Sequence, residues 1–423
     1  MESVGVGLLG LGTVGTEVAR RLIDEWELLG ERAGATPMLR SVAVRDVSRS
    51  RGVDLKNARL VADPQAVIAD PAVAIVVEVI GGTDPATALI ESSLRAGKTV
   101  VTANKAVIAA SGPRLSALAA EHGARLYFEA SVGAGLPIVA LLRGSLLGDR
   151  ISAIDCVING TTNVILTQMR TAGVSFQSAL ADAQRRGFAE ADPSLDVDGW
   201  DAAHKLVILA WLALGSYVAP DALDRVGIRD VTGDDVAALA QLGYRVRLLA
   251  HAERAAGAAV HLRVRPTAVG AAHLLHDVDD ADNAVIISSD LAATVMLRGL
   301  GAGGASTASA VVSDVVTAVR ERGAPTERMA AARAAVTMLG DEDAEVAGYV
   351  RVRLSSEADA RALVVQALED RGLAVDAAVD VAGSELIVLT AVAPRAVHDR
   401  ALETLDTLTS VDQILGALDR VEA

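Results

Sequence analysis

The fold of this chain is decided near its start by the residues Val4-Gly-Val-Gly-Leu-Leu-Gly10-Leu11-Gly12-Thr13-Val14-Gly15. Residues 4–9 are apolar, as expected of a buried strand, and the sequence after Gly15 has helical apolar spacing towards Leu29. In this order of strand, turn and helix, the first glycine permits a tight turn, Gly12 lets a pyrophosphate approach the backbone, and Gly15 lets the helix pack closely. The pattern predicts a dinucleotide site in an α/β domain. A turn that is merely rich in glycine is the alternative.

The residues after the second predicted strand, 39–44, bear on which dinucleotide is bound. That strand is followed by Arg45, Asp46, Arg49 and Arg51. The arginines suit the 2′-phosphate of NADP, whereas Asp46 suits the 2′-hydroxyl of NAD. The sequence favours NADP slightly over NAD, and a solvated turn with no role in binding is the third interpretation.

Residues 1–130 alternate short apolar runs with longer helical segments, which predicts an α/β fold with a parallel, Rossmann-like sheet. The further predicted elements are strands at 75–80 and 99–102 and a helix at 83–96 that ends before Gly97. A glycine cluster followed by a helix at 306–322 predicts that a segment of about 300–340 returns to this nucleotide-binding domain.

The rest of the chain has two other patterns. Residues 131–299 mix strands and helices, which predicts an α/β catalytic, substrate-binding and dimerisation domain. Residues 346–423 predict a third domain with the order βαββαβ, a ferredoxin-like module. Its expected strands lie at 349–354, 373–381, 385–391 and 411–417, and its expected helices at 357–370 and 395–407.

The composition excludes several classes of protein. A total of 39 basic and 54 acidic residues gives a net charge of −15, which repels nucleic acid and anionic membrane surfaces. The longest apolar stretch, 206–219, is shorter than the roughly 20 residues of a membrane-spanning helix and is interpreted as a buried helix. The single cysteine, Cys156, cannot form an internal disulfide. We therefore expect a cytoplasmic protein with no nucleic-acid and no membrane partner.

An acidic run stands directly before that apolar stretch. It contains Glu190, Asp192, Asp196, Asp198, Asp201 and finally Lys205. If a helix begins near Gly199, Asp201 and Lys205 lie at positions i and i+4 on one face. Such a pair is commonly a solvated ion pair, but the apolar residues that follow predict that this helix start is drawn into the protein. A lysine kept protonated by a carboxylate can donate a proton to an alkoxide during hydride addition to a carbonyl, and Asp192, Asp196 and Glu190 can bind a substrate ammonium group.

Other candidate residues receive structural interpretations. His273 and His276 have the spacing of metal ligands, but the irregular pattern around them favours a polar surface loop. His204 is interpreted as a packing or surface residue. Cys156 lies in an apolar, strand-like run without an evident base beside it, which indicates a core residue. Carbonyl reduction is therefore preferred over aldehyde oxidation through a thiohemiacetal.

Together with the glycine turn, four further segments carry a resemblance to a known family. They are Thr102-Ala-Asn104-Lys105, Val132-Gly-Ala-Gly-Leu-Pro137, Asn159-Gly160-Thr161-Thr162-Asn163 and the run from Glu190 to Lys205. From Gly10 to about Asp314 the chain resembles the homoserine dehydrogenases. The resemblance implies NAD(P)-dependent interconversion of L-homoserine and L-aspartate 4-semialdehyde, in threonine and methionine biosynthesis, by a homodimer or homotetramer.

The resemblance also implies roles for individual residues. Lys205 matches the catalytic proton donor, and Asp201 would orient it and the substrate hydroxyl. Substrate-binding positions are implied at Glu190, Asp196, Gly160, Thr161 and Lys105. Cofactor contacts are implied at Thr13, Val14, Thr83, Lys105 and Gly303, in addition to Gly10, Leu11, Gly12, Gly15 and Arg45. A monovalent cation, usually sodium, is implied at one carboxylate and nearby carbonyls, namely Glu129, Val132, Ala134 and Leu136; hard oxygen ligands suit such a cation.

The carboxyl-terminal module resembles an ACT domain, a regulatory fold that often binds amino acids at paired interfaces. The first loop of that fold usually has an acidic residue followed by Pro-Gly, whereas this chain has Ser355-Ser-Glu-Ala-Asp-Ala360. We expect the ACT-like fold and leave open whether it binds an amino-acid effector such as threonine.

Two other functions remain as alternatives. One is a catalytically silent NADP-binding regulator, against which the Asp201 and Lys205 pair argues. The other is an oxidoreductase for a different amino-acid-derived carbonyl, which would consume cofactor only with another substrate. The preferred interpretation expects the Lys205 ammonium to meet the reacting oxygen where the glycine turn delivers the nicotinamide.

Overall fold

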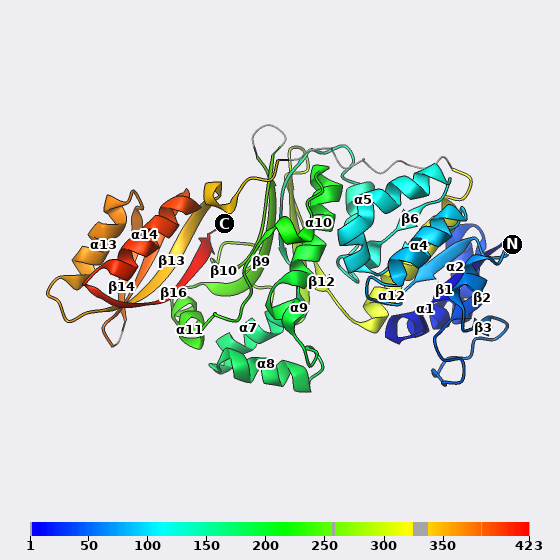
Figure 1. The fold of residues 1–423 in the computed structure, drawn as a ribbon, viewed down its shortest axis with the longest axis horizontal. Coiled ribbons are helices and arrows are strands. Elements are labelled where there is room, and N and C mark those ends of the chain that lie inside the picture. Colours follow the sequence, from blue (N-terminus) through cyan, green and yellow to red (C-terminus); the bar gives the residue numbers. More distant parts are fainter. Residues whose placement is uncertain (1, 256–258, 325–336, 382, 423) are drawn as a thin grey trace. The chain divides into compact units, whose positions relative to one another are not determined.

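A computed structural model describes residues 2–255, 259–324, 337–381 and 383–422. The chain folds as two compact units (Figure 1). Unit 1 consists of Met1–Ile151, His204–Asp221 and Ser288–Val336, and unit 2 consists of Ser152–Ala203, Ala222–Ile287 and Thr337–Ala423. The expected division into three domains remains a prediction, because the carboxyl-terminal module falls in unit 2 together with the central strands.

Unit 1 is built on a sheet of six strands in the order β3-β2-β1-β4-β5-β6, and each neighbouring pair is parallel. The strands are β1 (Ser3–Leu9), β2 (Thr36–Ala43), β3 (Arg59–Val61), β4 (Ile75–Glu78), β5 (Thr99–Thr102) and β6 (Leu126–Tyr127). This is the Rossmann order, in which ligands bind outside the carboxyl ends of the strands where the order reverses, here between β1 and β4. The predicted parallel sheet is confirmed.

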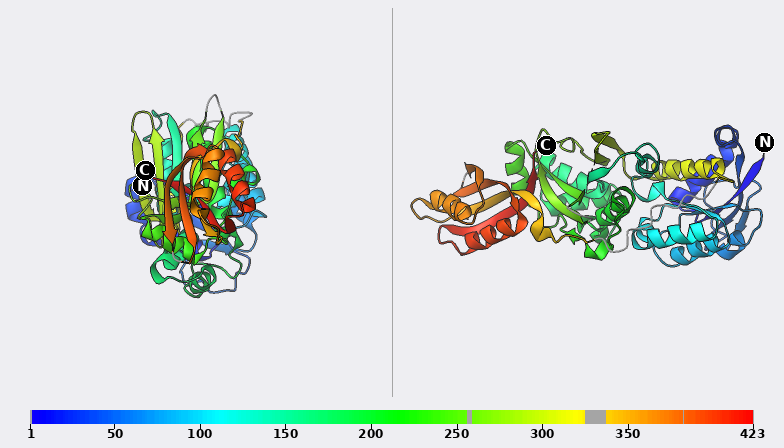
Figure 2. Two further views of the ribbon diagram at one scale, coloured as in Figure 1. Left: turned by 90° about the vertical axis from the view of Figure 1, so that its left-hand side faces the viewer. Right: turned by 90° about the horizontal axis from the view of Figure 1, so that it is seen from above.

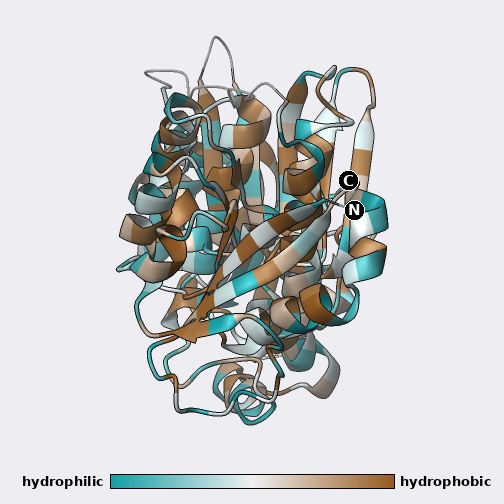
Figure 3. Ribbon diagram, turned by 90° about the vertical axis from the view of Figure 1, so that its right-hand side faces the viewer, coloured by the Kyte–Doolittle hydropathy of each residue, from teal (hydrophilic) through white to brown (hydrophobic). Residues whose placement is uncertain are grey.

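Helices cover both faces of this sheet (Figure 2). On one face α1, α2 and α12 pack together, and α3, α4 and α5 pack together on the other. The helices are α1 (Thr13–Asp24), α2 (Trp26–Ala33), α3 (Pro64–Ile68), α4 (Ala86–Arg95), α5 (Lys105–Glu121) and α12 (Gly304–Arg320). Unit 1 also contains η1 (Glu129–Ser131), α6 (Ile138–Arg143) and β12 (Thr294–Leu300), which is not a strand of this sheet. The strands and the helices both contribute hydrophobic residues to the core (Figure 3).

The helix predicted to continue from the glycine turn towards Leu29 is interrupted. Glu25 ends α1 and begins α2, with φ −114°. The interruption redirects the chain so that Leu29 on α2 packs into the core beside β2. Later in the chain, α12 contributes Val311 and Val315 to the same core. Within the expected return segment of 300–340, residues 325–336 lie outside the described residues.

Unit 2 is built on a mixed sheet with the order β11-β7-β9-β10-β16-β13-β15-β14. Its first part contains β7 (Ile151–Val157), α7 (Gly160–Ala172), α8 (Phe176–Arg185), α9 (Ser194–Val197), β8 (Asp224–Arg225), α11 (Gly233–Gln241), β9 (Arg245–Arg254), β10 (Val260–Val269) and β11 (Asp282–Ser289). The helix α10 (Trp200–Leu214) begins in unit 2 and continues into unit 1, and η2 (Pro220–Ala222) follows it.

The carboxyl-terminal part of unit 2 has the predicted βαββαβ order. It follows η3 (Asp341–Asp343) and consists of β13 (Glu345–Leu354), α13 (Ala360–Asp370), β14 (Val375–Val381), β15 (Glu385–Pro394), α14 (Arg395–Thr407) and β16 (Val411–Val421). The helices α13 and α14 pack on one face of the strands over a shared apolar core (Figures 1 and 2). The last strand, β16, also pairs in parallel with β10, from Thr267 opposite Asp419 to Val269 opposite Val421. Across the part of the chain that is described, no helix has both the length and the apolar character needed to cross a bilayer.

Candidate active site

The glycine turn joins β1 to α1, and two of its glycines have steric reasons within the protein. Gly10 has a φ of +101°, which side chains rarely adopt. A Cβ on Gly15 would lie 2.2 Å from the carbonyl oxygen of Gly10, so the helix passes too close for a side chain. A Cβ on Gly12, in contrast, would meet nothing within 4 Å. Protein packing therefore does not explain Gly12, whereas the close approach of a pyrophosphate does.

The start of α1 is suited to an anion. No side chain caps this helix start, so the N–H groups of its first turn and the positive end of the helix dipole are available for an anion. The start of α12 lies against the same turn, because a Cβ on Gly304, its first residue, would come within 2.7 Å of Cγ2 of Thr13. The structure thus brings the predicted Gly303 region, with Gly303 at φ +121°, to the predicted Thr13.

A cavity of about 750 Å³ opens at this turn within unit 1. The predicted cofactor residues that line it are Gly10, Leu11, Gly12 and Arg45. The cavity continues along the ends of β2 and β4 past Asp46, Arg49, Arg51, Ile80, Gly81, Asp84 and Pro85. Six other predicted cofactor residues do not line this cavity, namely Thr13, Val14, Gly15, Thr83, Lys105 and Gly303. Of these, Thr83 lies in the loop between Gly81 and Asp84, which do line it. Its volume is within the usual range for small-molecule sites.

The charged groups at the end of β2 have distinct partners. Asp46 Oδ1 accepts hydrogen bonds from the backbone N–H and the hydroxyl of Ser48, at 2.9 and 2.6 Å, and these bonds lower the pKa of Asp46. Arg51 donates to the carbonyl oxygens of Asp46 and Arg49, both at 2.6 Å. Asp46 is therefore engaged in its own turn, while Arg45, Arg49 and Arg51 make this end of the cavity positive.

A buried network behind the cavity escaped the sequence analysis. The carboxylate of Glu78, fully buried at the end of β4, accepts from the N–H of Ile80 at 2.7 Å and from the hydroxyl of Thr102 at 2.6 Å. Asn104 donates to the carbonyl of Gly82 at 2.6 Å and caps the start of α5. The network holds the loop after β4 and the predicted Lys105, the first residue of α5, in place. The sequence feature that could have indicated this network is an acidic residue, Glu78, at the end of an apolar strand.

In unit 2 an asparagine joins two residues of the acidic run. The side-chain amide of Asn159 donates to Asp196 Oδ1 at 2.7 Å and to Asp201 Oδ2 at 2.9 Å. Its carbonyl oxygen accepts from the N–H of Thr162 at 2.8 Å and so caps the start of α7. The predicted Gly160 and Thr161 follow at once on this helix. The structure thus brings Gly160, Asp196 and Asp201 together around Asn159.

The other acids of the run differ in role. Asp192 accepts from the backbone and hydroxyl of Ser194, and Asp198 forms an ion pair with Arg229. The predicted Glu190 is exposed, and Thr161 donates to the carbonyl of Phe188, two residues before it, at 2.8 Å. Thr161 therefore holds the loop that carries Glu190. The residue pattern alone did not separate Asp196 from Asp192, whereas the resemblance implied Asp196 and Glu190.

The helix α10 carries the predicted catalytic pair. It begins at Trp200, so Asp201 and Lys205 lie four residues apart on one face, as predicted. Their exposed fractions are 4% and 7%. Both side chains are thus buried, and the alternative of a solvated surface pair is wrong for this helix.

The predicted cation-binding loop is also buried. Glu129 accepts hydrogen bonds from the N–H groups of Val139 and Ala140 at 2.8 and 2.6 Å, at the start of α6. Burial raises the pKa of Glu129. Burial, together with the charge of Glu129, raises the pKa of Asp314 to about 8. The remaining predicted residues, Val132, Ala134 and Leu136, are buried, with Ala134 at φ +49°.

The structure supports the structural roles predicted for Cys156, His273 and His276. Cys156 on β7 is fully buried. His273 Nδ1 accepts from the N–H of Leu275, and His276 Nδ1 lies 2.9 Å from the carbonyl oxygen of Val269. These two histidines stabilise their own loop.

Comparison with known proteins decides the family. The family model for the homoserine dehydrogenase NAD-binding domain matches residues 10–129, and the model for homoserine dehydrogenase matches residues 137–316. The chain belongs to the homoserine dehydrogenase family. It is 34% identical over 422 residues to the homoserine dehydrogenase of Bacillus subtilis, covering 98% of this chain and 97% of that protein. It is 44% identical over 325 residues to that of Synechocystis sp., covering 75% of this chain and 73% of that protein.

Solved structures agree with this assignment. A crystal structure of a homoserine dehydrogenase from Thiobacillus denitrificans has a TM-score of 0.94 and 36% identity, covering 100% of this chain and 99% of that one. A hyperthermophilic archaeal homoserine dehydrogenase in complex with NADPH has a TM-score of 0.61 and 30% identity, covering 75% and 97%. The chain is therefore an NAD(P)-dependent oxidoreductase acting on a CH–OH group, a homoserine dehydrogenase of amino-acid biosynthesis with an NAD(P)-binding Rossmann-like domain.

Proposed function

We propose that Lys205 and Asp201 carry the chemistry of the reaction. The observation that supports this is the amide of Asn159, which holds the carboxylates of Asp196 and Asp201 on either side of it, one helical turn before the buried Lys205. When bound, NAD(P)H supplies a hydride to the aldehyde carbon of L-aspartate 4-semialdehyde. The ammonium of Lys205 donates a proton to the aldehyde oxygen, which becomes the hydroxyl of L-homoserine, and Asp201 orients Lys205.

The acids near Asn159 are proposed to recognise the substrate amino group. Asp196 and Glu190 would pair with the α-ammonium, and the start of α7 at Gly160 and Thr161 would face the polar groups of the substrate. The resemblance implies a substrate-binding role for Lys105 as well. 4-Hydroxybutanoate, which lacks the amino group, should then have a kcat/KM at least about a hundredfold below that of L-homoserine, because the acids are left without a partner. The rates are measured by nicotinamide absorbance.

Two variants refine that test. Asp196→Asn should reduce the discrimination between the two substrates, because one charge that binds the ammonium is lost. Asp192→Asn is the matched control and should preserve the discrimination, since Asp192 only caps its own turn. Preserved discrimination in Asp196→Asn would contradict this assignment. Turnover of neither substrate would support instead an oxidoreductase for another carbonyl.

The positive end of the nucleotide cavity supports NADP as the preferred cofactor. Arg45 follows β2 and lines the cavity, and Asp46 is engaged with Ser48. The archaeal relative in complex with NADPH supports the same preference. We expect Arg45→Ala to raise the KM for NADP⁺ about tenfold and to change the KM for NAD⁺ little, because only NADP⁺ has a 2′-phosphate.

The control for this substitution is Arg59→Ala. Arg59 is on β3, pairs with Asp70 and does not line the cavity. Initial rates with each cofactor at saturating L-homoserine provide the measurement. An equal loss for both cofactors in Arg45→Ala would contradict recognition of the 2′-phosphate.

A monovalent cation, sodium, is proposed at the loop of Glu129. The Glu129 carboxylate has lone pairs beyond the two that accept backbone N–H groups, and the carbonyls of Val132, Ala134 and Leu136 belong to the same buried loop. The neighbouring carboxyl of Asp314 adds a second acidic group. Hard oxygen donors and buried acidic groups fit such a cation, which would fix the shape of this loop.

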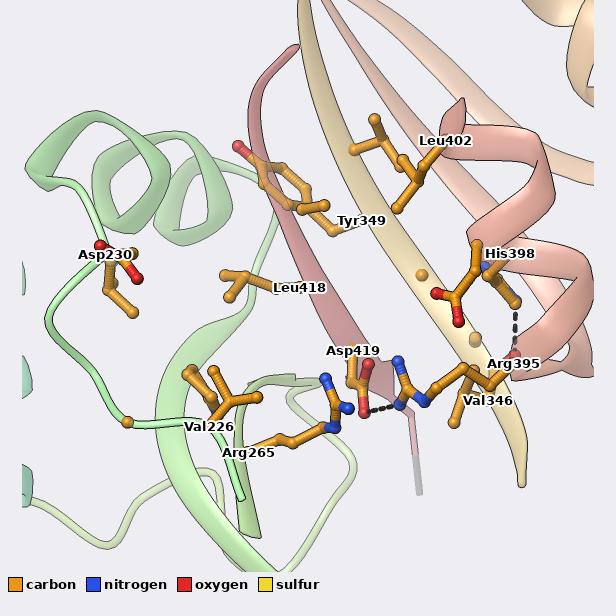
Figure 4. Close-up of a pocket in the computed structure, with 18 residues that line it drawn as sticks. Val226, Asp230, Arg265, Val346, Tyr349, Arg395, His398, Leu402, Leu418 and Asp419 are labelled. Carbon is orange, nitrogen blue, oxygen red and sulfur yellow. Dashed lines mark hydrogen bonds and ion pairs between the residues drawn. The ribbon is translucent and has the colours of Figure 1, made fainter. Parts of the chain in front are cut away.

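The carboxyl-terminal module is proposed to be an ACT-like regulatory domain. In its first loop Glu357 accepts from the hydroxyl of Ser410 at 2.6 Å, where the usual fold has Pro-Gly. A separate cavity of about 200 Å³ lies between this module and β10, lined by Arg265, Arg395 and Asp419 among others (Figure 4). Guanidinium and carboxylate groups together suit an amino-acid zwitterion such as threonine. Rates with and without threonine test this proposal.

From the same resemblance we propose that the protein is a homodimer or homotetramer in the cytoplasm.

A further inference from the structure

Two histidines and a glutamate form a cluster on the sheet of unit 2. His261 on β10 is directly opposite Glu253 on β9. His251 is two residues before Glu253 on β9, so the three side chains project from the same face of the sheet. One ligand atom from each of these side chains lies within 4.8 Å of the other two. None of these residues belongs to the active site described above.

A carboxylate holds the outer nitrogen of each imidazole. His251 Nδ1 lies 2.7 Å from Asp155 Oδ1, and His261 Nε2 lies 3.3 Å from Asp341 Oδ1. An ionised carboxylate can only accept a hydrogen bond, so these two ring nitrogens carry the hydrogens. In the neutral rings the lone pairs are then on His251 Nε2 and His261 Nδ1. These are the two nitrogens that face Glu253.

The spacing around Glu253 differs from that of hydrogen bonds. His251 Nε2 and His261 Nδ1 lie 3.6 and 3.7 Å from Glu253 Oε1, beyond the range of about 2.7–3.2 Å for a hydrogen bond from N–H to oxygen. His261 Nδ1 is buried without a hydrogen-bond partner, on a side chain only 3% exposed. Ligands that each lie about 2.0–2.1 Å from a tetrahedral zinc ion are about 3.4 Å apart. The distances from Glu253 to the two imidazoles are thus close to the separation of metal ligands, and all three ligand atoms lie within 4.8 Å of one another.

We propose that His251 Nε2, His261 Nδ1 and Glu253 Oε1 bind a zinc ion. Two histidines and a glutamate are an established zinc ligand set, and a carboxylate on the far nitrogen of each histidine is the usual outer support of such a site. Glu253 is 44% exposed, so solvent can reach the site and a water molecule can take the fourth position. Arg263, opposite His251 in the strand register, opposes the cation, while Asp155, Glu253 and Asp341 favour it.

The ion would connect distant segments of unit 2. Asp341 lies in η3, just before β13, and also accepts from Arg265 Nη2 at 2.8 Å. Through His261 and Asp341, zinc bound on β9 and β10 would tie this strand pair to the segment that leads into the carboxyl-terminal module. Its role is thus structural, and zinc should raise the melting temperature of the metal-free enzyme.

The test uses the full-length enzyme after treatment with a chelator. We expect one zinc ion per chain in a competition titration against a chromogenic chelator, and cobalt(II) should give the intense visible absorption of a tetrahedral site. In Glu253→Gln and His261→Gln the zinc affinity should fall more than about tenfold, and in Asp155→Asn, which removes an outer carboxylate, by about 10–100-fold. The buried Cys156 does not compete for the metal.

His122→Gln is the matched control, because His122 is an exposed histidine at the end of α5, in unit 1, and its loss should leave zinc binding unchanged. Circular dichroism checks that each variant is folded. The wild-type titration is decisive by itself, since the absence of one tight zinc ion per chain would overturn the proposal. Tight binding that survives in folded Glu253→Gln and His261→Gln would overturn it equally.

Discussion

The Lys205→Ala enzyme is expected to lose about 10²–10⁴-fold in kcat and to bind NADP⁺ almost as tightly as before. The loss has the size usual for removal of a positioned proton donor. The cofactor cavity at the glycine turn does not include Lys205, so NADP⁺ affinity should be preserved. Nicotinamide absorbance measures kcat in both directions, and calorimetric titration measures the dissociation constant of NADP⁺.

Two further variants separate chemistry from packing. Lys98 is also a buried lysine of unit 1, and it donates to the carbonyl of Asp70 at 2.8 Å. Lys98→Ala should lower the melting temperature and leave kcat nearly unchanged. Lys205→Arg keeps the positive charge, but a guanidinium does not release its proton near neutral pH, so kcat should stay well below normal. Near-normal kcat in Lys205→Ala would contradict the assignment of Lys205.

The second large effect is expected for Asn159→Asp. This change keeps an oxygen that can cap α7, so the fold should be preserved. It replaces the amide that donates to Asp196 and Asp201 with a third carboxylate, and like charges at this distance disfavour ionisation of all three. We expect kcat/KM for L-homoserine to fall by about a hundredfold or more, measured at neutral pH, with little change in the KM for NADP⁺.

A helix cap elsewhere provides the control for this variant. Ser175 caps α8 by accepting from the N–H of Ser178 at 3.3 Å. Ser175→Ala should cost about 1 kcal/mol of stability, as cap removal usually does, and leave kcat/KM unchanged. If Asn159→Asp retains normal kcat/KM while its melting temperature falls, Asn159 has only a structural role.

The fold could be predicted from sequence wherever the signal was local. The strand, glycine turn and helix at Gly10 and the βαββαβ order of residues 346–423 are each set by neighbouring residues, and both were found. The interruption at Glu25 was missed, because it depends on how Leu29 reaches the core beside β2. Such a change of direction is set by tertiary packing, and helical periodicity continues across it.

The site was predictable to a smaller extent. Asp201 and Lys205 could be paired because helical spacing alone places them on one face. The bridge from Asn159 to Asp201 spans 42 residues, and the contact between His261 and Asp341 spans 80. Such contacts depend on strand register and loop paths, which no local pattern contains. The same limit explains why the residue pattern, without the resemblance, could not separate Asp196 from Asp192.

The parallel pairing of β16 with β10 has a consequence for the evolution of the chain. The last strand, β16, pairs with the backbone of β10 along Thr267–Val269. Truncation of the carboxyl-terminal module would therefore leave unpaired backbone groups on β10. A shorter homologue would have to protect this exposed edge of β10 by other means, such as charged side chains, a covering loop or a neighbouring subunit.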